Sequence, residues 1–180
     1  MSSSHDVGEP SRRRFLQVGV ASGVLLSFAG LVAQGTRPRD PAGPLQVLSA
    51  DEYAVIAAIA DRMCPGSGRL PSASEIGVAD SVDALLARMD PWTQADVKSL
   101  LLLFESAWGG LLLEGRFTPF TALSPERQDE TLESWRRSSL DIKRAGYSAL
   151  RAIIVSRYWS DRRVYPFTGY PGPPSFGRSR

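Results

Sequence analysis

The feature that most constrains the fold is a series of apolar residues at helical spacing, interrupted by proline and glycine, between residues 48 and 160. The first segment begins with Ser49-Ala50-Asp51-Glu52, which matches a capping box, and ends at Pro65-Gly66. Between these signals the apolar residues recur every three or four positions, as on the buried face of an amphipathic helix. The pattern predicts a helix, with Cys64 as a small buried residue at its end.

Four further segments have the same periodicity. They cover residues 78–89, about 92–113, a stretch that begins at Ser124-Pro125, and residues 140–159. Ser124 is a good N-cap and Pro125 suits the first helical position. Residues 66–74 read as a loop, because Gly66-Ser67-Gly68 favours a turn. No segment alternates as a strand does, so the predicted fold is all-α, a small bundle of about five helices.

The tryptophans and the acidic residues of this region are assigned to core and surface, respectively. Trp92, Trp108 and Trp135 lie among leucines at helical spacing, which favours the core, and Thr93 is a candidate cap for the third helix. Four acidic residues share one face of the fourth predicted helix. Without a second source of ligands, such a face is typical of solvent exposure rather than of a metal site. These four residues are Glu126, Asp129, Glu130 and Glu133.

The first 35 residues differ in kind from the bundle. A basic stretch over residues 11–14 precedes an apolar run over residues 18–33, an order typical of a secretory signal. The order S-R-R-x-F-L resembles the twin-arginine signal of the bacterial pathway that exports folded proteins. We expect residues 1–35 to be a signal helix, cleaved or retained as an anchor, residues 36–47 to be a linker, and the protein to be periplasmic. The candidate signal residues are Ser11, Arg12, Arg13, Phe15 and Leu16.

Residue counts exclude several kinds of chemistry. The 180-residue chain has one cysteine, Cys64, and one histidine, His5, which lies in the polar leader. An intramolecular disulfide, a c-type haem motif and a cysteine-bound zinc or iron–sulfur cluster are excluded. A serine or cysteine nucleophile would have to recruit His5. We therefore expect no catalytic, cofactor-binding or metal-binding residues in this chain.

The charge of the chain is small in total and uneven in distribution. The net charge of +2 is too slight for a dedicated nucleic-acid binder. Residues 41–135 carry 6 basic and 14 acidic residues, whereas residues 136–180 carry 10 basic and 2 acidic residues. Two interpretations stay open: helices of opposite charge pack on each other, or the basic end meets an acidic partner.

Residues 158–176 combine aromatic rings with prolines. Six of the 16 aromatic residues lie in this segment, and four prolines lie between residues 166 and 174. Proline at this density disfavours a helix and favours extended geometry, and an extended strip cannot bury both of its sides. Residues 161–180 are therefore predicted to form an extended tail, which lies on its own domain or, as we prefer, on a partner. The candidate partner-binding residues are Tyr158, Trp159, Tyr165, Phe167, Tyr170, Pro171, Gly172 and Pro173.

Three features together resemble the gluconate 2-dehydrogenase subunit 3 family. They are the twin-arginine leader, the capped helix that runs into Cys64-Pro65, and the tail with Tyr158-Trp159-Ser160-Asp161 and Gly169-Tyr170-Pro171-Gly172-Pro173-Pro174. The resemblance implies a non-catalytic small subunit that binds a large FAD-dependent dehydrogenase of the glucose–methanol–choline type and assists its assembly.

The same resemblance implies how the complex would reach its compartment and pass on electrons. The small subunit would carry the large one, which holds the FAD, through the twin-arginine translocase. A separate haem-bearing subunit would receive the electrons. An independently exported helical enzyme or ligand-binding protein, and a membrane-tethered adaptor, stay open as alternatives.

Overall fold

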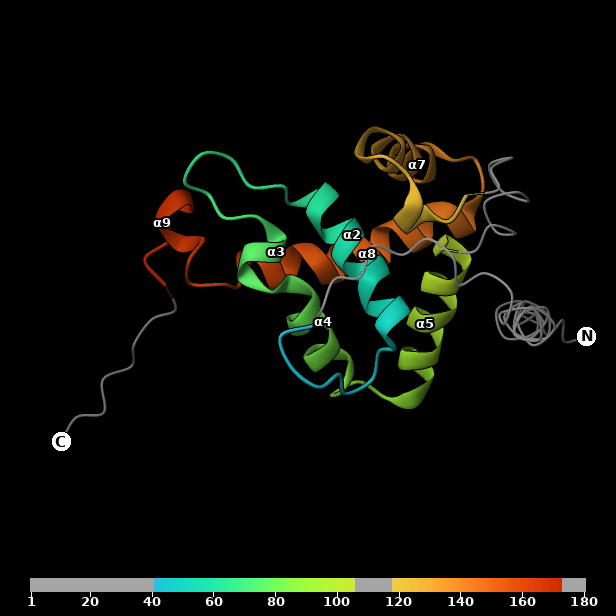
Figure 1. Ribbon diagram of the computed structural model, residues 1–180, viewed down its shortest axis with the longest axis horizontal. Helices are drawn as coiled ribbons and strands as arrows, with labels where there is room; N and C mark the ends of the chain where they lie inside the picture. Colours follow the sequence, from blue (N-terminus) through green and yellow to red (C-terminus); the bar gives the residue numbers. More distant parts are fainter. Residues whose placement is uncertain (1–40, 106–117, 173–180) are drawn as a thin grey trace, which may run out of the picture. The chain divides into compact units, whose positions relative to one another are not determined.

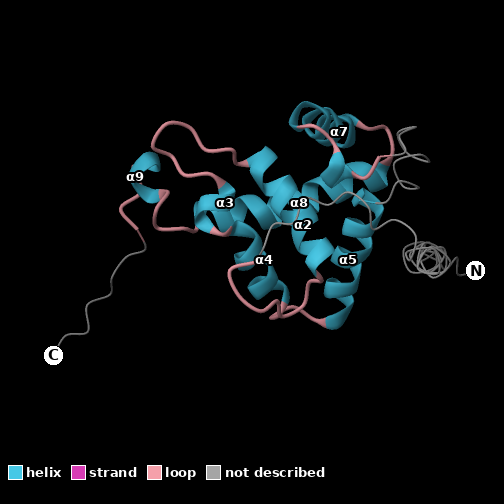
Figure 2. Ribbon diagram, viewed as in Figure 1, coloured by secondary structure: helices cyan, strands magenta, loops and turns pink. Residues whose placement is uncertain are grey.

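The computed structural model describes residues 41–105 and 118–172 of the chain. Within these residues there are seven α-helices, one 3-10 helix and no strand (Figures 1 and 2), which confirms the all-α class. None of the described helices is long and apolar enough to cross a bilayer. The predicted signal helix, Trp108 and Pro173 lie outside the described residues. The elements are α2 (Ala50–Met63), α3 (Ala73–Ile76), α4 (Val78–Leu86), α5 (Pro91–Glu105), η2 (Phe120–Ala122), α7 (Pro125–Arg137), α8 (Asp141–Trp159) and α9 (Tyr165–Thr168).

Helix α2 is the centre of the core. Eight consecutive residues, from Tyr53 to Ala60, are buried, because α3, α4, α5, α7 and α8 all pack on α2. Its predicted capping box is present: the N–H of Glu52 donates to Ser49 Oγ at 3.2 Å, and the N–H of Ser49 donates to the Glu52 carboxylate at 2.8 Å. Cys64, at the end of the helix, is buried as expected.

An aromatic cluster joins α5, η2 and α7. The ring centroid of Phe104 lies 4.8 Å from that of Phe120 and 4.3 Å from that of Trp135. Helix α8 approaches this cluster closely because residue 146 is glycine. A Cβ there would lie 2.7 Å from Leu100 Cδ1 and 3.0 Å from Trp135 Cζ3. The predicted burial of Trp135 is confirmed.

The prediction for Trp92 is wrong. Its side chain is 84% exposed, in the first turn of α5. The prediction that Thr93 caps this helix is also wrong, because Asp90 does so. The Asp90 carboxylate accepts the N–H groups of Trp92 and Thr93, both at 3.0 Å. Helix α5 is therefore capped about one turn earlier than expected. Trp92 belongs to its first turn and lies on the solvent side of the helix.

A buried carboxylate fastens the segment before α2 to α4. Asp83 is 3% exposed and accepts the N–H groups of Gln46, Val47 and Leu48 at 2.7, 3.0 and 2.8 Å. Burial opposes ionisation, but these three donors outweigh it and lower the pKa of Asp83. On the same helix, Asp80 accepts the N–H of Ala42 at 3.0 Å. Part of the predicted linker is thus held against α4.

Residues 66–76 contain a turn and an unexpected helix. Gly66 has φ +72°, and a Cβ there would lie 2.7 Å from the carbonyl oxygen of Leu70, so the predicted turn requires glycine. The four-residue α3 follows where a loop was predicted. It begins with a second capping box, in which Ser72 and Glu75 bond each other's backbone N–H groups.

Candidate partner-binding surface

The root of the C-terminal tail is buried in the helical domain. Tyr158 is 2% exposed, and its hydroxyl donates to the main-chain oxygen of Pro71 at 2.7 Å. Burial also raises the pKa of Tyr158, which keeps the phenol protonated as a donor. Val164, six residues further along, is fully buried. Tyr158, which we predicted at the partner surface, is therefore a core residue.

Arg163 fixes the next part of the tail to α3. Its guanidinium donates to the main-chain oxygens of Glu75 and Ile76 at 3.1 and 2.8 Å, and to the Asp161 carboxylate at 2.9 Å. The hydrogen bond between the two side chains raises the pKa of Arg163 and lowers that of Asp161. The carbonyl end of α3 thus gains a cation, which is the favourable charge at a helix C-terminus.

The middle of the tail is helical where extended geometry was predicted. Tyr165–Thr168 forms one turn, α9, which ends at Gly169 with φ +68°. Pro166 stands in the first turn of this helix, where its missing N–H costs nothing. The Tyr165 hydroxyl donates to the main-chain oxygen of Ser160 at 3.1 Å. Proline density therefore limits the helix to one turn without excluding it.

Aromatic surface remains exposed on this fixed root. Trp159, Phe167 and Tyr170 are each 47% exposed, and Pro171 is also exposed. The ring of Tyr170 packs edge-on against Tyr165, with centroids 5.0 Å apart, and Tyr165 is half-buried. Among the described residues of the tail, the outer ones thus present rings to solvent in a defined arrangement. Gly172 is half-buried beside them, with φ +99°.

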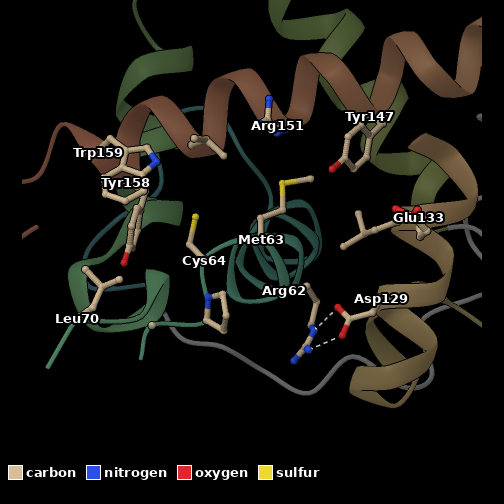
Figure 3. A pocket seen from close by; sticks show the side chains of 14 residues that line it. Arg62, Met63, Cys64, Leu70, Asp129, Glu133, Tyr147, Arg151, Tyr158 and Trp159 are labelled. Atoms are coloured by element: carbon tan, nitrogen blue, oxygen red, sulfur yellow. Dashed lines mark hydrogen bonds and ion pairs between the residues drawn. The ribbon is translucent and has the colours of Figure 1, made fainter. Parts of the chain in front are cut away.

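An open groove of about 550 Å³ lies between three elements: the C-terminal end of α2, helix α7 and helix α8 (Figure 3). Helix α8 contributes one residue at every fourth position, so that they form one row along the helix: Tyr147, Arg151, Val155 and Trp159. Figure 3 shows Tyr147, Arg151 and Trp159 of this row above Met63 and Cys64 at the end of α2, with Asp129 and Glu133 of α7 on one side. The remaining lining residues are Arg62, Pro65, Gly66, Leu70, Asp129, Leu132, Glu133 and, also on α8, Tyr158.

The α7 carboxylates at the groove are paired with arginines. Asp129 accepts two hydrogen bonds from Arg62 of α2, at 2.6 and 2.8 Å, and the pKa of Arg62 rises as a result. Glu133 bonds Arg136 at 2.6 Å and also Arg137, and these contacts lower its pKa. On the acidic face of α7, Glu126, Asp129 and Glu130 are exposed as predicted, whereas Glu133 is half-buried. In the residues that the structure describes, no three potential metal ligands come together.

Cys64 lies on the groove wall with an unreactive thiol. Burial raises its pKa to about 11, and a thiol with so high a pKa is almost entirely protonated near neutral pH. The groove therefore offers contact surface rather than a nucleophile. Sequence reasoning missed the groove, because three separate helices build it. The recurrence of Tyr147, Arg151, Val155 and Trp159 at every fourth residue was the available signal.

Comparison with protein families identifies a relationship over the helical domain. The model of the family described as Gluconate 2-dehydrogenase subunit 3 matches residues 50–172, more than half of the chain. The matched range begins with the first residue of α2 and contains every described helix. Searches of curated proteins and of solved structures found no match.

Proposed function

Because this chain belongs to the gluconate 2-dehydrogenase subunit 3 family, we propose that it is the non-catalytic small subunit of a flavoprotein dehydrogenase complex. The family description names a subunit of a gluconate 2-dehydrogenase. In our proposal the chain binds a large FAD-dependent subunit of the glucose–methanol–choline type and assists its assembly. That large subunit oxidises a sugar, sugar acid or polyol, and it holds the FAD and the reacting groups.

The observation that carries the proposal is the exposed aromatic surface on an anchored tail. Trp159, Phe167 and Tyr170 keep nearly half of their surface in solvent, although burying each large ring is worth roughly 1.5–3 kcal/mol. Arg163 and Val164 hold the supporting segment in place. Aromatic side chains on a rigid support are typical of residues that dominate binding energy at protein interfaces.

The side-chain chemistry favours an accessory role. The single histidine lies in the leader, and the single cysteine is buried with a raised pKa. Of the two carboxylates that line the groove, Asp129 is bonded to Arg62. Glu133 is bonded to Arg136 and Arg137, which lower its pKa and disfavour its use as an acid. These observations support placing the reaction in the partner.

The leader supports the second half of the proposal, which is export. Arg12-Arg13 followed by Phe15-Leu16 and an apolar run resembles a signal for the exporter of folded proteins. A flavoprotein that binds FAD in the cytoplasm has to cross the membrane folded. We propose that this leader takes the whole complex through the twin-arginine translocase to the periplasm, where a haem-bearing subunit receives the electrons.

Co-purification tests the binding half directly. The full chain, tagged at its C-terminus, is expressed together with the FAD-dependent dehydrogenase encoded beside it. We expect the two proteins to elute in one peak with flavin absorbance. An unrelated FAD enzyme of another fold serves as the control and should not co-elute. Elution of the tagged chain alone, with no flavin in its peak, would overturn the proposal.

A further inference from the structure

We infer that the groove between α2, α7 and α8 is a second docking site for the large subunit, which adjoins the exposed aromatic surface at Trp159. It receives an apolar segment of that subunit which places a carboxylate beside Arg151. This inference rests on the proposed function and adds the chemistry of the docked segment.

The residues along the α8 row are the types that dominate protein interfaces. Tyr147, Arg151 and Trp159 belong to the three residue types most enriched among binding hot spots. They lie beside Val155 of the same row and beside Met63 and Leu132 from the facing helices. The groove thus combines an apolar wall with aromatic rings and one arginine, a composition that suits a peptide segment with apolar side chains.

The charges at the groove select an acidic segment. Four charged residues line it, and in the described part of the chain three of them are paired: Arg62 with Asp129, and Glu133 with Arg136 and Arg137. The fourth, Arg151, is exposed and has no hydrogen bond or ion pair with any described residue. It also lies within the basic part of the sequence, where residues 136–180 carry 10 basic and 2 acidic residues. A carboxylate docked beside Arg151 would therefore pair with a groove cation that no described residue of this chain neutralises.

The groove and the tail share a residue. Trp159 lines one end of the groove, and it is also the last residue of α8, directly before the tail. Its ring packs edge-on against the buried Tyr158, with centroids 5.2 Å apart, so its position is fixed from the core. A partner that contacts Phe167 and Tyr170 can continue over Trp159 into the groove. A volume of about 550 Å³ has room for a few of the partner's side chains.

Charge reversal and filling of the groove test the inference in the assembled complex. The variants are Arg151→Glu, which repels the docked carboxylate, and Val155→Arg, which occupies the groove. The control is Arg88→Glu, an equal charge reversal at an exposed position beyond the end of α4, outside the groove. Each full-length variant is titrated with the purified flavoprotein, and its thermal unfolding is compared with that of the wild type.

We expect Arg151→Glu and Val155→Arg to weaken the complex at least tenfold, and Arg88→Glu to change affinity less than twofold. The affinity of Arg151→Glu should also depend less steeply on salt concentration. If both groove variants bind like the wild type while a tail variant, Phe167→Ser with Tyr170→Ser, does not, the groove inference is wrong and the proposed function stands. Equal weakening by Arg88→Glu, or a dimer of this chain that Arg151→Glu dissociates, would overturn it as well. If the wild type binds no flavoprotein, both proposals fail.

Discussion

The guanidinium of Arg163 donates to the main-chain oxygen of Ile76 at 2.8 Å, across 87 positions of the sequence. This bond links the beginning of the tail to the end of α3. Together with the buried Val164, it determines where the outer rings of the tail lie. The tail is therefore a preorganised part of the domain up to α9, which reduces the entropy lost when a partner binds it.

Removal of this link should weaken both stability and binding. Arg163→Ala removes the guanidinium that donates to two carbonyl oxygens of α3 and to the Asp161 carboxylate, which keeps only the main-chain N–H of residue 163. We expect the free energy of unfolding, measured with urea, to fall and partner affinity to fall several-fold. Arg162→Ala, at the exposed neighbouring position, should leave stability unchanged. A variant of Arg163 with wild-type affinity would show that the tail needs no anchoring.

The exposed rings should contribute to binding and not to stability. Phe167→Ser with Tyr170→Ser removes two side chains that are each 47% exposed. We expect co-purification of the flavoprotein to drop at least tenfold, with little change in thermal unfolding. The matched control is Leu140→Ser with Ile142→Ser, at exposures of 49% and 48% on another part of the surface. If the control pair weakens the complex as much as the tail pair, the tail has no special role.

The arginine pair of the leader should determine where the dehydrogenase activity is found. Arg12→Lys with Arg13→Lys keeps the charge but removes the signal that the exporter recognises. We expect activity to stay in the cytoplasmic fraction, while the complex still forms. Arg37→Lys with Arg39→Lys is the control and should not redistribute the activity. Periplasmic activity in the leader variant would argue against export through this route.

The carboxylate of Asp83 should contribute to stability in a pH-dependent way. Asp83→Asn keeps the shape but loses the charge that accepts three N–H groups, so we expect a loss of about 2 kcal/mol at pH 7. The folded-state pKa of Asp83 is lowered, so its contribution is complete above the unfolded-state value of about 3.9 and is lost as the pH falls below it.

Urea unfolding at several pH values measures this effect. The difference between wild type and Asp83→Asn should be constant near neutrality and shrink below about pH 4. Asp96→Asn, an exposed residue of α5, is the control and should differ little from wild type at any pH. A difference that grows on acidification would contradict the assignment of the stabilising charge to Asp83.

Cys64 should react slowly in the native protein. With a pKa of about 11, roughly one thousandth of the thiol is ionised at pH 8, and the side chain is also buried. We expect alkylation by iodoacetamide, followed by mass spectrometry, to be complete in urea and barely detectable without it. Rapid modification of the native chain would mean that the end of α2 opens readily.

Local signals predicted the beginnings of α2 and α7 correctly. The capping box at Ser49 and Glu52, and Ser124 followed by Pro125, satisfy backbone donors within one turn, so neighbouring residues determine them. Helix α3 has an equally clear signal, Ser72 with Glu75, but its four residues are too few to show an apolar period. It was therefore assigned to a loop.

Long-range contacts were not predictable in the same way. The helical spacing places Trp92 on a helix but does not say whether a neighbouring element covers that turn, and none does among the described residues. Asp83 stands among apolar positions of α4, and its partners lie 35 to 37 residues earlier. The groove needs Arg62, Asp129 and Arg151 from three helices, and no local pattern shows that they meet.

The carboxylates of Asp80 and Asp83 have a mechanical consequence for a chain that is pulled by its leader. Both hold the backbone ahead of α2, at Ala42 and at Gln46 to Leu48. A force that pulls on the N-terminal side acts on these four hydrogen bonds before it acts on α2. The force passes into α4, so α2 bears none of it until the hydrogen bonds to both carboxylates break.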